Sequence, residues 1–516
     1  MLRNRDRMSR ILLGLAVFGG ASSLSDAATP ATAAAVSGQY VAYAADCASC
    51  HTAPGGKPFA GGNALQSAFG TIYGPNITAD TETGIGAWSK ADFERALRRG
   101  VRKDGAYLYP AMPYGSYTKM SGPDMDALWT YIHGLAPVKN VVPKNTLPFP
   151  LTIRSGMAVW QSLYFKPGPF QPSAAHDQTW NRGAYLVEAL GHCEDCHTPR
   201  NAAQGLEDQR SLTGAEIEGW YAPDISNDPL SKLSTWKTAD LAHYLQTGST
   251  PDNAKAFGPM QEVVHDSLQH LSNADLLAMA VYLKDQDTGA AAKTPSKPKL
   301  SSDRLAAGRR IYEDNCSSCH QANGKGVAGS APALAGNDAV TAAEPYNVIM
   351  ALLEGFSPQG SWGAMGSFAN ALSDDQIADV TNYVRTAWNN QGLPNATPWS
   401  VANWRKNAQP SNDEANALLC PSLPQELMQP ALSAGADGLS QAASDRSKMN
   451  KLVANYLAAR PKTSTAQVIE ALSTAYCRSL AGDHLSQARM SAQIADFAQH
   501  VAVAAGGRKA KLNSAT

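Results

Sequence analysis

The sequence is poor in aromatic side chains, in charge and in long apolar runs. Aromatic residues make up 8% of the 516 residues, charged residues make up 17%, and the formal net charge is −1. This near-neutral balance excludes the basic surface that nucleic-acid binding requires. Beyond the N-terminus, no apolar run reaches the roughly 20 residues of a membrane-spanning helix. The sequence also contains no glycine-rich dinucleotide fingerprint and no candidate nucleophile, so it is not expected to oxidise a substrate alone.

The N-terminus has the pattern of an export signal. Its positive segment contains Arg3, Arg5, Arg7 and Arg10, and an apolar run at 11–20 follows. Small residues then allow cleavage after Ala27 or after Ala33. The apolar run is too short to be a permanent anchor. The sequence therefore predicts a signal peptide at residues 1–27 and an exported protein.

Six of the eight cysteines form three C-x-x-C-H motifs, and these motifs determine the class of cofactor. The motif residues are Cys47, Cys50 and His51, then Cys193, Cys196 and His197, then Cys316, Cys319 and His320. Two thiols at this spacing can each bond a vinyl group of one haem, and the adjacent histidine can bind its iron. Redox-active C-x-x-C pairs and zinc knuckles are the alternatives, but a zinc site would need a second ligand pair nearby. Three covalently bound haems c are therefore predicted.

An internal repeat indicates the sixth iron ligand in the first two units. The segment YGPNIT at Tyr73 recurs as YAPDIS at Tyr221, and the segment that begins WSKADF recurs in the same register. In that register Met112 corresponds to Met260, whereas the rival Met120 corresponds to a leucine. Core packing is the ordinary role of a single methionine, but this coincidence favours Met112 and Met260 as axial ligands.

The third unit is shorter and does not follow the repeat. Its candidate ligand is Met365, which lies just ahead of a predicted helix near Ser373. Met350 is the alternative, but it belongs to an apolar helical pattern that is typical of a core. Methionine is favoured over the remaining histidines in every unit.

The fold class expected from these patterns is all-α, with three tandem class I cytochrome c-like helical domains at 36–135, 181–286 and 304–392. Linkers are predicted at 136–180 and 287–303, and a helical C-terminal extension at 400–516. Each unit has a glycine in a helix before its motif and a closing helix after its methionine, and the glycine would let these two helices cross closely. The glycines are Gly38, Gly183 and Gly308. Three prolines are candidates to orient the motif histidines through their carbonyl groups, with loop punctuation as the alternative. They are Pro75, Pro223 and Pro332.

Two further segments leave alternatives open. Cys420 and Cys477 in the C-terminal extension are expected to form a disulfide in an exported chain, although two buried thiols remain possible. The apolar and aromatic run at 157–165 favours packing against the haem units. A surface for a partner, a quinone or the bilayer interface is the other interpretation.

Residues from about 38 to 392 resemble the triple-haem cytochrome c subunits of membrane-bound bacterial dehydrogenases that act on alcohol, gluconate or sorbitol. The resemblance rests on GPNITADTETGIGAWSKADFERALRRG in the first unit, LPFPLTIRSGMAVWQSLYF in the first linker and RGAYLVEALGHCEDCHTPRNA in the second unit. It implies three His/Met haems at the residues named above.

The resemblance also implies a place in a respiratory complex. A dehydrogenase catalytic subunit of the flavin, PQQ (pyrroloquinoline quinone) or molybdenum type would oxidise a CH–OH donor, and this chain would pass the electrons to ubiquinone. It would be periplasmic and peripherally attached to the outer face of the inner membrane. A free periplasmic multihaem carrier, and a haem enzyme with one open iron position, are the competing interpretations. The three methionines argue against the enzyme.

Overall fold

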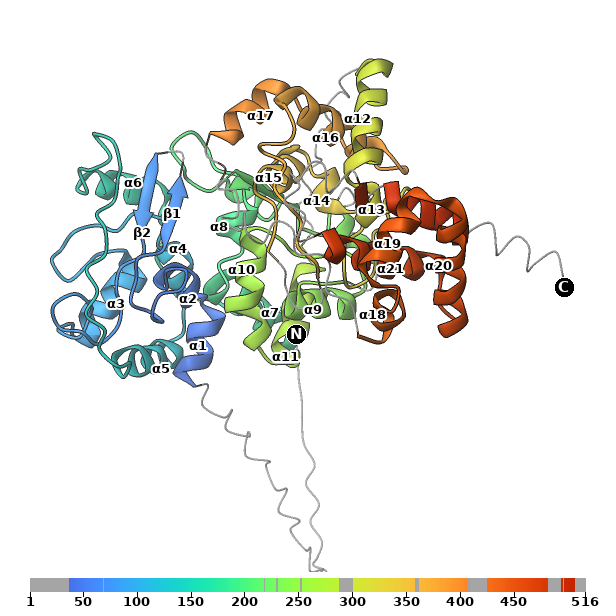
Figure 1. Cartoon of the computed structure of the whole chain (residues 1–516). Helices are drawn as coiled ribbons and strands as arrows, with labels where there is room; N and C mark the ends of the chain where they lie inside the picture. The colour runs from blue at the N-terminus through green and yellow to red at the C-terminus, as the bar shows by residue number, and fades with distance from the viewer. Residues whose placement is uncertain are drawn as a thin grey trace, which may run out of the picture. The chain divides into compact units, whose positions relative to one another are not determined.

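The computed structural model of the protein is mainly helical, with two short antiparallel hairpins (Figure 1). It describes residues 37–67, 69–217, 219–228, 231–250, 253–286, 300–357, 362–406, 408, 425–480, 493–494 and 496–505. The predicted signal peptide, most of the predicted linker at 287–303, and Cys420 lie outside these residues. Among the helices that the structure describes, none is long and apolar enough to span a bilayer.

The first region contains the first C-x-x-C-H motif. Its elements are α1 (Gly38–Ala44), α2 (Cys47–His51), β1 (Ala64–Ser67), β2 (Gly70–Tyr73), α3 (Lys90–Arg99), α4 (Tyr114–Tyr117) and α5 (Gly122–His133). The motif itself forms α2. One further helix, α6 (Gly156–Tyr164), lies in the segment that leads to the second motif.

The second region repeats this arrangement with additional short helices. Its elements are α7 (Gln178–Tyr185), the π-helix η1 (Leu186–Leu190), α8 (Glu194–His197), η2 (Asp208–Arg210), β3 (Ala215–Ile217), β4 (Trp220–Ala222), η3 (Lys232–Thr235), α9 (Thr238–Thr247), α10 (Pro259–Asp266), η4 (Leu268–His270) and α11 (Asn273–Leu283). Met260 lies in the first turn of α10.

The third region and the C-terminal segment are helical throughout their described elements. The third region has α12 (Ser302–Asn315), α13 (Ser317–His320), α14 (Asp338–Thr341), α15 (Tyr346–Glu354), α16 (Asp374–Thr386) and α17 (Pro398–Arg405). The C-terminal segment has α18 (Gln425–Leu432), α19 (Gly435–Ser444), α20 (Arg446–Ala459) and α21 (Thr465–Leu480). The helices expected in this segment are therefore confirmed. Cys477 is disulfide-bonded, and its expected partner lies outside the described residues.

The two hairpins are the departure from an all-helical chain. β1 pairs with β2 in the register Ala64↔Tyr73, and β3 pairs with β4 in the register Ala215↔Ala222. Strands of three or four residues are too short to show the alternation that identifies a strand in a sequence. Each hairpin ends just before a proline segment, so it positions Pro75 or Pro223 beside the motif of its own region.

The paired helices of each region begin at side chains that cap them. An N-cap oxygen accepts a hydrogen bond from the free backbone N–H groups of the first helical turn. The caps are Ser37 for α1, Ser121 for α5, Asp177 for α7, Ser272 for α11, Ser301 for α12 and Ser373 for α16. Because the same local signal recurs at equivalent places, the three helix pairs start in equivalent registers.

Each helix pair crosses at a glycine, as the sequence predicts. A Cβ atom added at Gly38 would lie 2.0 Å from the carbonyl oxygen of Ala127 on α5. Added at Gly183, it would lie 2.0 Å from the carbonyl oxygen of Ala278 on α11. Such distances are far below a van der Waals contact, so only glycine permits the observed approach of the two helices. The third region has the same crossing between α12 and α16 at Gly308.

The buried side chains of the described residues form three cores. One core is shared by the first and second regions, and it runs from Val41 to Leu283. The third region has its own core, which also includes Trp220 from β4 and Val401 from α17. The C-terminal segment has a separate core that includes Tyr456 and Phe497. Helix α17 therefore packs with the third region, although residues from 400 onward were expected in the extension.

Candidate functional site

The three motif histidines have the same environment. Each is buried, with 8% or 9% of its surface exposed, and each Nδ1 lies within hydrogen-bonding distance of a proline carbonyl oxygen. The pairs are His51 and Pro75 at 2.8 Å, His197 and Pro223 at 2.7 Å, and His320 and Pro332 at 2.9 Å. A carbonyl can only accept, so Nδ1 carries the proton and donates it to the oxygen. The predicted contacts between the three proline carbonyl groups and the motif histidines are therefore confirmed.

This environment suits iron ligation by the other ring nitrogen. Burial lowers the pKa of His51, of His197 and of His320, which keeps each imidazole neutral. With Nδ1 engaged, Nε2 retains its lone pair, and a neutral imidazole with a fixed tautomer is a good metal ligand. The histidines therefore fit the axial position beneath a haem iron.

The motif cysteines fit covalent haem attachment better than disulfide chemistry. Burial raises the pKa of the thiols of Cys47, Cys193 and Cys316 to about 12. Redox-active C-x-x-C pairs have the opposite property, because their reactive thiol has a lowered pKa. None of the six motif cysteines is in a disulfide. Among the described residues there is also no cluster of three or more His, Cys, Asp or Glu side chains that could hold a metal ion, as a zinc knuckle would require.

The candidate methionines differ from their rivals in burial. Met112 and Met260 are partly buried and pack on the rim of the shared core, and Met365 packs in the same way on the third core. Met120 and Met350 lie inside these cores, with 0% and 3% exposed. The rivals are therefore occupied in packing. Met112, Met260 and Met365 remain predictions as iron ligands.

The first and second motifs are joined by a short chain of contacts that the sequence did not indicate. The hydroxyl of Tyr117 donates a hydrogen bond of 2.5 Å to the carbonyl oxygen of Ala45, two residues before Cys47. The ring of His192, directly before Cys193, meets the Tyr117 ring edge-on at 5.7 Å. In the sequence alone His192 looks like an ordinary histidine, because a contact between distant segments leaves no local pattern.

Three aromatic rings join the second and third regions. Trp220, Phe257 and Phe356 lie with their ring centroids 5.6 to 6.1 Å apart. Phe257 precedes Met260 by three residues. The backbone of Phe356 pairs with that of Met365 through hydrogen bonds of 2.7 and 2.9 Å. The aromatic cluster therefore lies between the segments that carry two of the candidate iron ligands.

Asn253 strengthens the same junction. Its backbone carbonyl oxygen accepts from the N–H of Ala333 at 2.9 Å, and its side-chain amide donates to the carbonyl oxygen of Ala331 at 2.9 Å. These residues flank Pro332, which holds His320. The left-handed backbone of Asn253, with φ of 66°, is tolerated well by asparagine.

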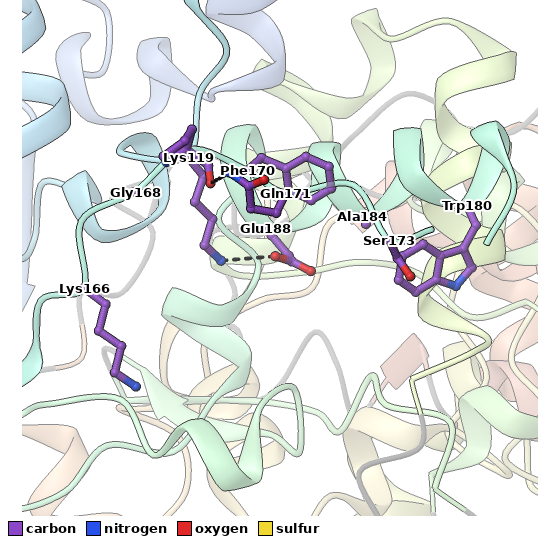
Figure 2. Close-up of a pocket in the computed structure, with 10 residues that line it drawn as sticks. Lys119, Lys166, Gly168, Phe170, Gln171, Ser173, Trp180, Ala184 and Glu188 are labelled. Atoms are coloured by element: carbon purple, nitrogen blue, oxygen red, sulfur yellow. Dashed lines mark hydrogen bonds and ion pairs between the residues drawn. The ribbon is translucent and has the colours of Figure 1, made fainter. Parts of the chain in front are cut away.

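A cleft of about 320 Å³ is lined by Lys119 of the first region, by the segment at 166–173, and by residues of α7 and η1. Figure 2 shows Lys119 pointing toward Glu188, and the two groups are 3.2 Å apart. The hydroxyl of Tyr282 also donates to Glu188 at 2.7 Å. Lys119 comes from the first region and Glu188 from η1 of the second, so the ion pair is a further link between these two regions.

Comparison with known proteins supports this interpretation. A family model for cytochrome c matches residues 35–136 and 305–388, which contain the first and third motifs. The chain is 39% identical over 404 residues to the gluconate 2-dehydrogenase cytochrome c subunit of Pantoea cypripedii, covering 74% of this chain and 91% of the relative.

Two further relatives show similar agreement. The cytochrome c subunit of alcohol dehydrogenase (quinone) from Gluconacetobacter polyoxogenes is 38% identical over 399 residues, covering 72% of this chain and 84% of the relative. The fructose dehydrogenase cytochrome subunit of Gluconobacter japonicus is 38% identical over 396 residues, covering 70% and 81%. Covalent haem c binding and electron transfer are therefore the function class of this protein. The chain belongs to the family of dehydrogenase cytochrome c subunits.

Proposed function

We propose that the chain carries three haems c and relays electrons from a periplasmic dehydrogenase to ubiquinone in the membrane. The observation that supports this most strongly is the threefold repetition of one buried histidine, oriented by a proline carbonyl, beside two cysteines. When bound, haem c supplies a one-electron couple between ferric and ferrous iron.

In this proposal the protein's own residues attach each haem and supply both protein ligands of its iron. The thiols of Cys47 and Cys50, and the corresponding pairs at the other two motifs, attach the haems. His51, His197 and His320 would bind the irons through Nε2, and Met112, Met260 and Met365 would supply the second protein ligand of each iron. With two protein ligands for each iron, none would be left open to substrate, so the oxidation of a CH–OH donor would belong to a separate catalytic subunit. That subunit would be of the flavin, PQQ or molybdenum type.

We further propose three cytochrome c-like domains arranged as a relay in the order first, second, third. The contacts of Tyr117 connect the first and second motifs. The cluster of Trp220, Phe257 and Phe356 connects the second and third regions. These contacts support placing the second haem between the other two.

The segment around α6 supports a peripheral attachment to the periplasmic face of the inner membrane. Residues 136–176 include four Lys or Arg residues and no Asp or Glu. Trp160 and Tyr164 face the second region, where the Trp160 indole donates to the carbonyl oxygen of Ala203 at 2.8 Å. Val159 and Leu163 are 65% and 68% exposed. The packing that the sequence favoured therefore involves only the aromatic side, and the exposed apolar side suits a lipid interface. The excess of basic over acidic residues in 136–176 favours an anionic surface, although Lys139 and Lys166 also pair with Glu82 and Asp208.

The membrane proposal can be tested with anionic vesicles. The doubly substituted Val159→Ser, Leu163→Ser protein is expected to bind them more weakly than the wild type in a flotation assay. Leu277→Ser changes an apolar side chain of α11 that is 43% exposed, and it is expected to leave binding unchanged. Equal binding by all three proteins would reject this face as the attachment site.

The relay is tested by purifying the tagged chain from detergent-solubilised membranes. We expect a dehydrogenase subunit at equal stoichiometry, identified by mass spectrometry, and reduction of the chain's haems when that subunit's substrate is added. The alternative function is a free periplasmic multihaem carrier. Recovery of the chain alone, from the soluble fraction, would favour that alternative.

A further inference from the structure

The C-terminal segment packs against the third motif. Helix α21 contacts α13, the short helix formed by Ser317–His320. The segment has its own core, to which α21 contributes Val468 and Leu472, and Cys477 near the end of α21 is disulfide-bonded. It is therefore a folded unit held against the place where the third haem would be attached.

Helix α21 brings one carboxylate to this contact. Glu470 is only 9% exposed, and its side chain hydrogen-bonds to Ser330, which is 8% exposed. Ser330 lies in the loop of Pro332, whose carbonyl oxygen accepts from His320, and its own carbonyl oxygen accepts from the N–H of Gly363 at 2.9 Å. Gly363 is two residues before Met365. Glu470 is thus hydrogen-bonded to a loop that contacts both His320 and the segment before Met365. These two residues are the candidate ligands of the third iron.

The charge of Glu470 acts on the third motif. Desolvation raises the pKa of the Cys319 thiol most, and the nearby Glu470 carboxylate makes a smaller contribution in the same direction. On the neighbouring helix α20, burial raises the pKa of Tyr456, Arg460 lowers it, and Glu470 makes a smaller contribution that raises it. Arg460 also pairs with Glu426 at 3.5 Å. Burial raises the pKa of Glu470 itself to about 7, and the hydrogen bond from Ser330 opposes this shift. The carboxyl can therefore change its charge near neutral pH.

We propose that the C-terminal segment covers the third haem and that Glu470 sets the reduction potential of that haem by binding a proton when it is reduced. A carboxylate near the haem stabilises the more positive ferric form and lowers the potential. On reduction by one electron, the Glu470 carboxylate would take one proton from solvent, so the combined charge of the haem and the carboxyl would be unchanged. This inference rests on the proposed attachment of a haem at Cys316 and Cys319.

The test is a potentiometric titration of the full-length holoprotein at about pH 5 and about pH 9, on either side of the carboxyl's pKa. In the wild type, one of the three midpoint potentials is expected to be lower at the higher pH. Glu470→Gln keeps the size and the contact with Ser330 but cannot ionise. Its corresponding potential is expected to be independent of pH and equal to the low-pH value of the wild type.

Two further variants make the result specific. Glu426→Gln removes a carboxylate of the same segment whose side chain is 72% exposed, and all three potentials should then follow those of the wild type. Ser330→Ala leaves Glu470 in place without its hydrogen bond, which raises the pKa of the carboxyl. Potentials measured at intervals between about pH 5 and about pH 9 should therefore show the change at a higher pH than in the wild type.

Haem content, measured from the alkaline pyridine spectrum, distinguishes a failure of the triple-haem proposal from a failure of the proposed role of Glu470. Two haems in the wild type would overturn both the triple-haem function and this inference. Three haems, with Glu470→Gln potentials identical to those of the wild type at both pH values, would overturn the role of Glu470 alone.

Discussion

Tyr40 on α1 donates a hydrogen bond of 2.6 Å to Asp275 on α11, and its oxygen accepts from the backbone N–H of Ser272 at 3.0 Å. The reverse contact has the same form. Tyr185 on α7 donates to Asp124 on α5 at 2.5 Å and accepts from the N–H of Ser121 at 3.0 Å. Each of the first two regions therefore inserts a tyrosine into the start of the other's closing helix, which explains why they share one core.

This reciprocity predicts the effect of removing one hydroxyl. Tyr40→Phe removes the acceptor of the Ser272 N–H and one hydrogen bond of Asp275, which keeps its two bonds from Arg182. The loss should cost about 0.5–1.5 kcal/mol of unfolding free energy. Tyr185→Phe should cost a similar amount. Because both bonds support one interface, the double variant should deviate from additivity in a denaturation experiment. Strictly additive losses would indicate that the two regions unfold independently.

The close helix crossings predict that replacing one glycine by alanine lowers the stability of the protein. At Gly308 an added Cβ would lie 2.2 Å from the carbonyl oxygen of Asp379 on α16. Gly308→Ala must therefore separate the two helices and should destabilise the protein by about 1–3 kcal/mol or more, as overpacking does. Gly122→Ala is the control, because a Cβ there meets nothing within 4 Å. Equal stability of the two variants in urea titrations would contradict the close crossing.

Substitution of Met112 and of Met120 should affect different properties, the optical spectrum in the first case and the stability in the second. Met112→Ala is expected to open one iron position, which would produce a high-spin component and carbon monoxide binding in the optical spectrum. Met120→Ala removes a fully buried core side chain and should cost about 2–5 kcal/mol of stability with an unchanged spectrum. An altered spectrum for Met120→Ala alone would assign the ligand to the rival.

The buried Asp46 predicts a stability that falls as pH rises. The pKa of Asp46 is raised from 3.8 to about 8, mainly by burial and less by the nearby Asp266 and Glu262, while the hydrogen bond from Ser49 opposes the shift. Between these two values the folded state holds a proton that the unfolded state has released. Stability therefore falls with increasing pH in this window, with a slope of up to about 1.4 kcal/mol per pH unit.

Asp46→Asn tests this slope, because asparagine tolerates the left-handed backbone at this position, where φ is 48°. The variant should lose the contribution of Asp46 to the pH dependence of unfolding between about pH 4 and pH 8. Parallel curves for the two proteins in chemical denaturation would show that Asp46 is ionised in the folded state.

The local parts of the site could be predicted from the sequence, and the long-range parts could not. The spacing within each motif identified His51, and a proline in a repeated segment identified Pro75 as its partner, because both patterns lie within a few residues. The crossing at Gly38 followed from the glycine that recurs in the helix before each motif. Contacts such as Tyr117 with Ala45 join segments 72 residues apart. They depend on how complete regions pack, and no local pattern records them.

Glu470 illustrates the same limit. In the sequence it is one acid within an amphipathic helix, where a solvent-exposed position is the ordinary expectation. Its burial arises because α21 packs on α13, which lies about 150 residues earlier in the chain. The short hairpins escaped prediction for a different reason, since three or four residues do not show a strand periodicity.

The central claim is that three haems are attached, one at each motif. Intact mass spectrometry of the mature protein tests it directly, together with three variants in which both cysteines of one motif are changed to alanine. The account predicts a wild-type mass with three haems and a loss of one haem in each variant. A wild type with fewer than three haems, or a variant that keeps the wild-type number, would contradict it.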